Sequence, residues 1–111
     1  MVIYKIFHAP EWDAMQTAGQ TDGAPVDLAD GFVHFSTAEQ VKETASRHFA
    51  GASDLVLVAA NPATMGDALR WEASRGGAEF PHLYAPFAMV HVLWSRPLPL
   101  DPGGHRFPDL V

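Results

Sequence analysis

The stretch from Asp30 to Thr37 contains a turn, a short apolar segment with a histidine, and the start of a helix. Ser36 and Thr37 follow His34 where free backbone N–H groups at a helix start favour an anionic or carbonyl ligand. A neutral imidazole can bond a ribose hydroxyl or accept a proton near neutral pH. We therefore expect ligand chemistry at His34. The alternative interpretation is a histidine satisfied by hydrogen bonds at a sheet surface.

Arg70 and Glu72 project from one face of an expected strand. An arginine can hold a phosphate or carboxylate, and a glutamate can bind a hydroxyl or stabilise a developing positive charge. The alternative is a solvated ion pair that contributes about 0–1 kcal/mol. Trp71 lies between them and is expected in the core.

His82 and Tyr84 lie in a proline-bracketed segment, Phe80–Pro86, that we expect to be an ordered loop because its prolines oppose a helix. Fixed loops commonly carry ligand-binding side chains. The same two side chains could instead tie the loop to the body of the domain.

Other chemistries have weaker support. A zinc or iron site from His34, His82 and Glu72 lacks any paired-ligand spacing, so no metal is expected. A hydrolase built on Ser36 lacks the strand–turn–helix context of a nucleophile elbow. No glycine-rich phosphate loop follows an expected strand, which argues against the common dinucleotide-binding and P-loop motifs.

Composition narrows the class of protein. The chain has 111 residues, 48% of them hydrophobic, with 7 Lys and Arg against 13 Asp and Glu and no cysteine. An excess of acidic residues does not favour binding to duplex nucleic acid or to an anionic membrane. Because the chain has no cysteine, disulfides and thiol catalysis are excluded. No targeting or membrane-spanning pattern is evident, so we expect a soluble cytoplasmic protein whose partner is a small molecule or nucleotide. Composition does not predict the oligomeric state.

Hydrophobic periodicity predicts one α+β domain over residues 1–111, with a mixed or antiparallel sheet and two main helices. Lys5 is the odd member of an otherwise apolar central strand. One helix should run from Pro10 to Gly19, and the other should be capped by Ser36 or Thr37, with Glu39 or Gln40 completing a capping box. The expected strands span residues 2–7, 31–35, 55–60, 68–73 and 87–94, with a loop over residues 20–30 and an irregular tail from about residue 96.

Several motifs together resemble the DUF952 family, a group of short bacterial proteins of unassigned function. They are Ile3-Tyr4-Lys5-Ile6, Asp30 to Thr37 with Gln40, Trp71-Glu72, and Phe80-Pro81-His82-Leu83-Tyr84. That family in turn looks distantly similar to the ADP-ribosyltransferase superfamily, which includes the RNA 2′-phosphotransferases. The resemblance covers nearly the whole chain and implies a split-sheet core that binds NAD or an ADP-ribosylated compound.

The resemblance also implies roles for particular residues. His34 and Ser36 match a His-Leu-Ser segment of the relatives, and Lys5 stands where relatives often carry an NAD-contacting histidine. Our first hypothesis is therefore a transferase-like enzyme acting on NAD, ADP-ribose or a related nucleotide, with His34 and Glu72 catalytic. Its ligand-binding residues would be Lys5, Ser36, Thr37, Arg70, His82 and Tyr84. The second hypothesis is a non-catalytic small-ligand binding module, and the third is a structural or partner-binding domain.

Overall fold

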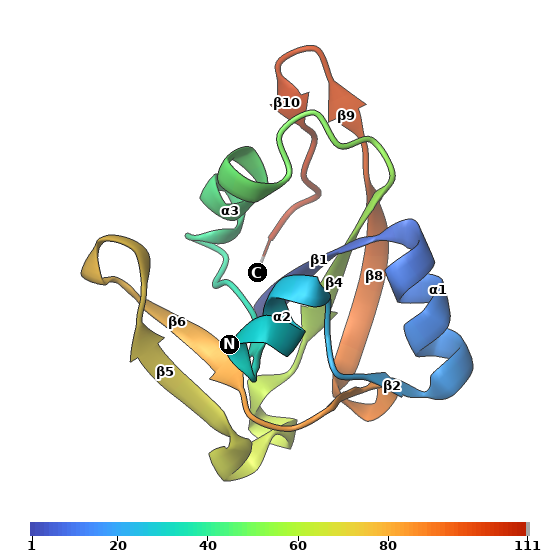
Figure 1. Cartoon of the computed structure of the whole chain (residues 1–111). Helices are drawn as coiled ribbons and strands as arrows, with labels where there is room; N and C mark the ends of the chain where they lie inside the picture. Colours follow the sequence, from blue (N-terminus) through green and yellow to red (C-terminus); the bar gives the residue numbers. More distant parts are fainter. Residues whose placement is uncertain (111) are drawn as a thin grey trace.

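The computed structural model describes residues 1–110, apart from the side chain of Arg75. Over these residues, two three-stranded sheets, two two-stranded sheets and three α-helices make up one α+β domain (Figure 1). Every strand pairing among residues 1–110 is antiparallel, which confirms the antiparallel form of the expected sheet. Three α-helices are present where two main helices were predicted.

The first sheet has the strand order β1 (Ile3–His8), β4 (Leu55–Ala60) and β8 (Val92–Leu98). Its central strand, β4, is apolar on both faces, as expected for a strand covered on both sides. The prediction that the first strand is central was wrong. β1 pairs along its length only with β4, and on its other side an isolated bridge joins Tyr4 to Ser36.

Two apolar clusters cover the two faces of this sheet. On one face Phe7 and Val58 pack with Trp12 and Met15 of helix α1 (Ala9–Ala18). On the other face Tyr4 and Leu57 pack with helix α3 (Val41–His48) through Val41 and Ala45. Lys5 points to the α1 side of the sheet, where it is 6% exposed.

The second sheet has the order β3 (Val33–His34), β6 (Glu79–Leu83) and β5 (Leu69–Ala73). The predicted loop over residues 80–86 is therefore wrong for residues 80–83, which form the central strand. A proline has no N–H to donate to a neighbouring strand, but Pro81 is tolerated in β6 because the pairing with β3 ends beside it. At this point the Pro81 carbonyl accepts a hydrogen bond from the Phe35 N–H at 3.0 Å. Trp71 is 38% exposed on β5, contrary to the expected core position.

The loop predicted over residues 20–30 also contains regular structure. Strand β2 (Gln20–Thr21) pairs with β7 (Phe87–Ala88), and helix α2 (Pro25–Asp30) follows. Helix α2 lacks a hydrophobic period, because its buried residue is a carboxylate, Asp27, while Val26 and Leu28 are exposed. Helix α1 ends as predicted at Gly19, whose φ of 85° suits a left-handed cap.

The last part of the chain differs from the prediction in two ways. The strand expected over residues 87–94 is interrupted by a 3-10 turn, η4 (Met89–His91), between β7 and β8. The tail is not irregular from residue 96, because β8 continues to Leu98 and a short hairpin of β9 (Leu100–Asp101) and β10 (Gly104–His105) follows. Three further 3-10 turns are η1 (Pro62–Thr64), η2 (Gly66–Ala68) and η3 (Arg75–Gly77).

Among residues 1–110, no helix combines the length and apolar character that crossing a bilayer requires.

Candidate functional site

One face of the second sheet carries most of the predicted site residues. His34 of β3 is paired with His82 of β6, and His82 is paired with Arg70 of β5, so the three side chains share a face. Glu72 lies on the same face two residues after Arg70 on β5, and Tyr84, just past the end of β6, reaches it through the bond from its hydroxyl to Glu72. The alternation of side chains along the strands therefore brings five predicted residues together.

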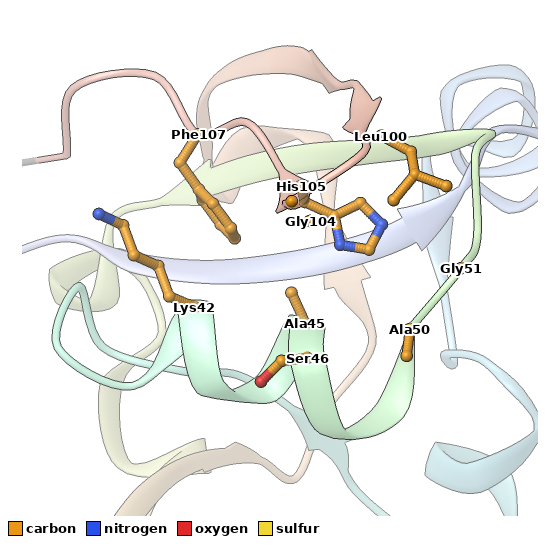
Figure 2. Close-up of a pocket in the computed structure, with 10 residues that line it drawn as sticks. Lys42, Ala45, Ser46, Ala50, Gly51, Leu100, Gly104, His105 and Phe107 are labelled. Atoms are coloured by element: carbon orange, nitrogen blue, oxygen red, sulfur yellow. The ribbon is translucent and has the colours of Figure 1, made fainter.

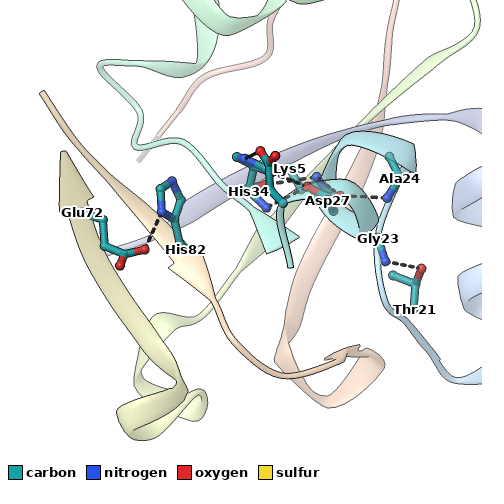
Figure 3. A network of polar contacts seen from close by, with 9 residues as sticks. Lys5, Thr21, Gly23, Ala24, Asp27, His34, Glu72 and His82 are labelled. Carbon is teal, nitrogen blue, oxygen red and sulfur yellow. Dashed lines mark hydrogen bonds and ion pairs between the residues drawn. The ribbon is translucent and has the colours of Figure 1, made fainter. Parts of the chain in front are cut away.

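His82 is held in place on this face. Its Nδ1 lies 2.8 Å from Oε1 of Glu72, and its side chain is only 6% exposed. The Phe32 ring stacks against the imidazole with 4.1 Å between ring centroids. Figure 3 shows the Glu72–His82 contact reaching from β5 to β6. Position and ring orientation are thus fixed by a hydrogen bond and an aromatic contact.

Glu72 accepts a second hydrogen bond. The Tyr84 hydroxyl donates to Oε1 of Glu72 at 2.8 Å. The hydrogen bonds from His82 and Tyr84 hold the pKa of the Glu72 carboxyl below its usual range, and the same bond raises the pKa of Tyr84. An ionised carboxylate only accepts hydrogen bonds, so Nδ1 of His82 carries a hydrogen and donates it to Glu72.

Arg70 packs against Tyr84 on the same face of the second sheet. Its guanidinium lies over the Tyr84 ring at 4.8 Å from the centroid. Tyr84 itself is 40% exposed. The arrangement packs Arg70 against the outer residues of the sheet.

Asp27 of α2, which sequence analysis missed, organises the other half of the site. It is fully buried, and its Oδ2 lies 2.9 Å from Lys5 Nζ and accepts the Ala24 N–H at 2.7 Å. Its Oδ1 accepts the backbone N–H of His34 at 2.9 Å and lies 2.6 Å from His34 Nδ1. Figure 3 shows these contacts meeting on α2.

These contacts determine the charge of Asp27. Burial of the carboxyl alone would raise its pKa, but hydrogen bonds from His34 and the positive charge of Lys5 outweigh burial and lower the pKa to about 2. Asp27 is therefore ionised under ordinary conditions. The signal for it in the sequence was Lys5, because a lysine inside a buried strand requires a carboxylate partner.

Both ring nitrogens of His34 lie beside carboxylates. Nδ1 contacts Asp27, and Nε2 lies 3.0 Å from Oδ2 of Asp30. The ionised Asp27 carboxylate accepts a hydrogen bond, so Nδ1 carries a hydrogen, whereas the contact of Nε2 with Asp30 is an ion pair only when the ring is protonated. In this arrangement a carboxylate oxygen lies beside each ring nitrogen of His34.

The backbone N–H groups of Ser36 and Thr37, where the second helix was expected to start, are bonded within the protein. The Ser36 N–H donates to the Tyr4 carbonyl at 2.9 Å, and the Thr37 N–H donates to Oε1 of Gln40 at 3.0 Å. The latter contact is half of one predicted capping box. Helix α3 begins only at Val41, after a turn, so the helix start expected at Ser36 or Thr37 is absent and the N–H groups of these two residues are already bonded.

A cavity of about 580 Å³ lies between β1, α2, α3 and β6. Its volume is in the range of small-molecule sites. Aromatic and aliphatic side chains supply part of its wall, including Tyr4, Phe35, Phe49 and Phe80. Polar groups converge on it from several elements: Lys5, His8, Glu11, Asp30, His34, Ser36, Thr44, His48 and His82.

The predicted ligand-site residues divide into two groups of equal size. Four line this cavity: Lys5, His34, Ser36 and His82. The other four lie outside its lining: Thr37, Arg70, Glu72 and Tyr84. Glu72 is connected to the cavity through His82, whereas Ser36 Oγ is already 2.8 Å from Thr44 Oγ1.

A second cavity of about 390 Å³ lies between α3 and the β9–β10 hairpin (Figure 2). Lys42, Phe107 and His105 stand along it, and Lys42 Nζ lies 5.9 Å from the Phe107 centroid. His105 Nε2 contacts the Ala52 carbonyl at 2.8 Å. None of the predicted site residues lines it.

Comparison with known proteins agrees with this architecture. The model of a family described as "Protein of unknown function (DUF952)" matches residues 6–95. The chain belongs to the DUF952 family. The family assignment confirms the resemblance found in the sequence, whereas no match supports the further likeness to ADP-ribosyltransferases. No curated protein matches the chain.

Solved structures similar to this DUF952 chain include protein CC0527 from Caulobacter crescentus. Its crystal structure is 48% identical with a TM-score of 0.92, and the match covers 96% of this chain and 94% of that one. Its solution NMR structure is 49% identical with a TM-score of 0.84, covering 94% and 90% of the two chains.

Proposed function

We propose that this DUF952 chain binds a nucleotide-like molecule, such as NAD or ADP-ribose, in the 580 Å³ cavity and acts on it as a transferase-like enzyme. The observation that carries the proposal is the composition of the cavity wall. Apolar and aromatic surface suits a base, whereas imidazoles and a hydroxyl suit ribose hydroxyl groups. One wall of the cavity, formed by His34 and His82, belongs to a rigidly bonded sheet face.

The site favours the nucleoside part of such a ligand over its phosphates. Lys5 is neutralised by Asp27, and Arg70 lies over Tyr84 outside the cavity lining. The phosphate contact that we assigned to Arg70 therefore has no support in its position. We propose that the base and ribose are bound inside and that phosphates lie toward solvent.

A non-catalytic binding module is the second candidate. It is favoured by the extent to which Lys5, Asp27 and His34 satisfy one another, because such groups then serve mainly to shape the cavity. This candidate uses the same cavity and differs only in the fate of the ligand.

Isothermal titration with NAD and with ADP-ribose tests binding, and chromatography of the NAD sample tests turnover. We expect heat of binding with at least one of them at millimolar concentration, and His82→Ala should weaken it at least several-fold. His105→Ala, which removes an imidazole from the smaller cavity, is the matched control and should leave binding unchanged. Absence of heat with both ligands would contradict the proposal, and binding without release of nicotinamide would favour the non-catalytic module.

A further inference from the structure

We propose that His82 is the proton acceptor of this site and that Glu72 is the positioning residue that keeps its Nε2 available to the cavity. This inference rests on the proposed function. It assigns the role to His82, whereas the sequence pointed to His34.

The availability of one ring nitrogen follows from hydrogen bonding. Nδ1 of His82 donates to Glu72 at 2.8 Å, so in the neutral ring Nε2 carries the lone pair. Nε2 has no hydrogen-bond partner among the residues that the structure describes. Every buried side-chain nitrogen or oxygen in these residues has a partner, so Nε2 is not a buried atom. Because His82 lines the cavity, the accessible nitrogen is open to the cavity.

His34 contrasts with His82 although the two are neighbours. Their ring centroids are 5.3 Å apart, and both side chains line the cavity. His34 is more exposed, at 31% against 6%, but a carboxylate lies beside each of its nitrogens, Asp27 2.6 Å from Nδ1 and Asp30 3.0 Å from Nε2. Exposure alone would therefore select His34, whereas an Nε2 with no carboxylate beside it among the described residues selects His82.

In a transfer step on NAD, the free nitrogen of His82, Nε2, accepts a proton. A water or hydroxyl oxygen forms a bond to ribose C1′, and the bond from C1′ to the nicotinamide nitrogen breaks with its electron pair going to nicotinamide. His82 Nε2 accepts the proton that the attacking oxygen loses, and later releases it to solvent. Glu72 stabilises the protonated ring without touching the reacting atoms.

Diethyl pyrocarbonate tests the assignment without requiring turnover. A neutral imidazole nitrogen attacks its carbonyl carbon, so the reagent reports an available lone pair, and mass spectrometry of peptides locates the modification. We expect His82 to react several-fold faster than His34 despite its lower exposure. An equal or faster rate at His34 would overturn the proposal.

Variants of Glu72 test positioning. Glu72→Gln keeps an oxygen that accepts from Nδ1, so ¹⁵N spectra should still place the ring hydrogen of His82 on Nδ1, whereas Glu72→Ala should give a mixture of tautomers. Glu43→Gln makes the same change in an exposed ion pair with Arg47 and should leave His82 unaltered. Identical wild-type-like tautomers in all three variants would contradict the role of Glu72.

Added ADP-ribose separates this inference from the proposed function. If calorimetry shows binding, saturating ADP-ribose should slow modification of His82 several-fold, and an unchanged rate would overturn the inference. If ADP-ribose and NAD do not bind, the proposed function fails, while the relative rates at His82 and His34 still decide which imidazole is available.

Discussion

Asp27 is the residue on which the polar contacts around His34 converge. Its two carboxylate oxygens together contact Lys5, Ala24 and His34 from three different segments. A buried lysine without this partner would be an uncompensated charge. Asp27 therefore supports the cavity wall without having to contact a ligand.

We predict that Asp27→Asn destabilises the fold by roughly 3–5 kcal/mol near neutral pH, as expected when one partner of a buried ion pair is removed. The folded-state pKa of Asp27 is lowered to about 2, so its stabilisation is present above the ordinary pKa of 3.8 and is lost as the pH falls toward 2. The stability difference between wild type and variant should thus shrink by about 2 kcal/mol between pH 6 and pH 2. Urea unfolding at a series of pH values measures it.

Asp54→Asn is the control, because Asp54 pairs with His8 where both side chains are largely exposed. Its effect should stay within about 1 kcal/mol at each pH. A difference for Asp27→Asn that stays constant across the series would contradict the lowered pKa.

At the scale of elements, α2 depends on a close approach to Gly23. A Cβ atom at Gly23 would lie 2.4 Å from Cβ of Asp27, and the φ of this glycine is +111°. We predict that Gly23→Ala costs more stability than the roughly 1–3 kcal/mol of backbone strain alone, because Asp27 would have to move away from Lys5 and His34. Thermal and urea unfolding measure the loss.

Gly19→Ala provides the comparison for this prediction. Gly19 also has a positive φ, +85°, but a Cβ atom added there would meet no other atom within 4 Å. Gly19→Ala should therefore lose the stability that backbone strain costs, with no further loss from a steric clash. Equal losses in the two variants would mean that contact with Asp27 has no part in the effect.

The elements that sequence analysis predicted correctly are those with a clear hydrophobic period. β4 and α1 follow from an unbroken apolar run and from apolar residues at helical spacing. β6 was mistaken for a loop because Pro81 usually opposes a central strand, and only the early end of β3 makes it acceptable. α2 was missed because its inward residue is charged, which no hydrophobic pattern reveals.

For the molecule as a whole, the sequence predicted which polar residues would gather but not how they would pair. Arg70, Glu72, His82 and Tyr84 do lie together with His34, because antiparallel pairing aligns their faces. The contacts that distinguish His34 from His82 come from Asp27 and Asp30 on α2 and from Glu72 on β5. Such contacts depend on long-range placement and could not be read from spacing.

The location of the bound ligand tests the central claim most directly. In a titration of the ¹⁵N-labelled protein with ADP-ribose, we predict that the largest amide shifts fall on residues lining the 580 Å³ cavity, such as Lys5, His34 and His82. Residues of the smaller cavity, such as Lys42 and His105, should change little. Shifts concentrated at the smaller cavity, or none at millimolar ADP-ribose, would contradict the account.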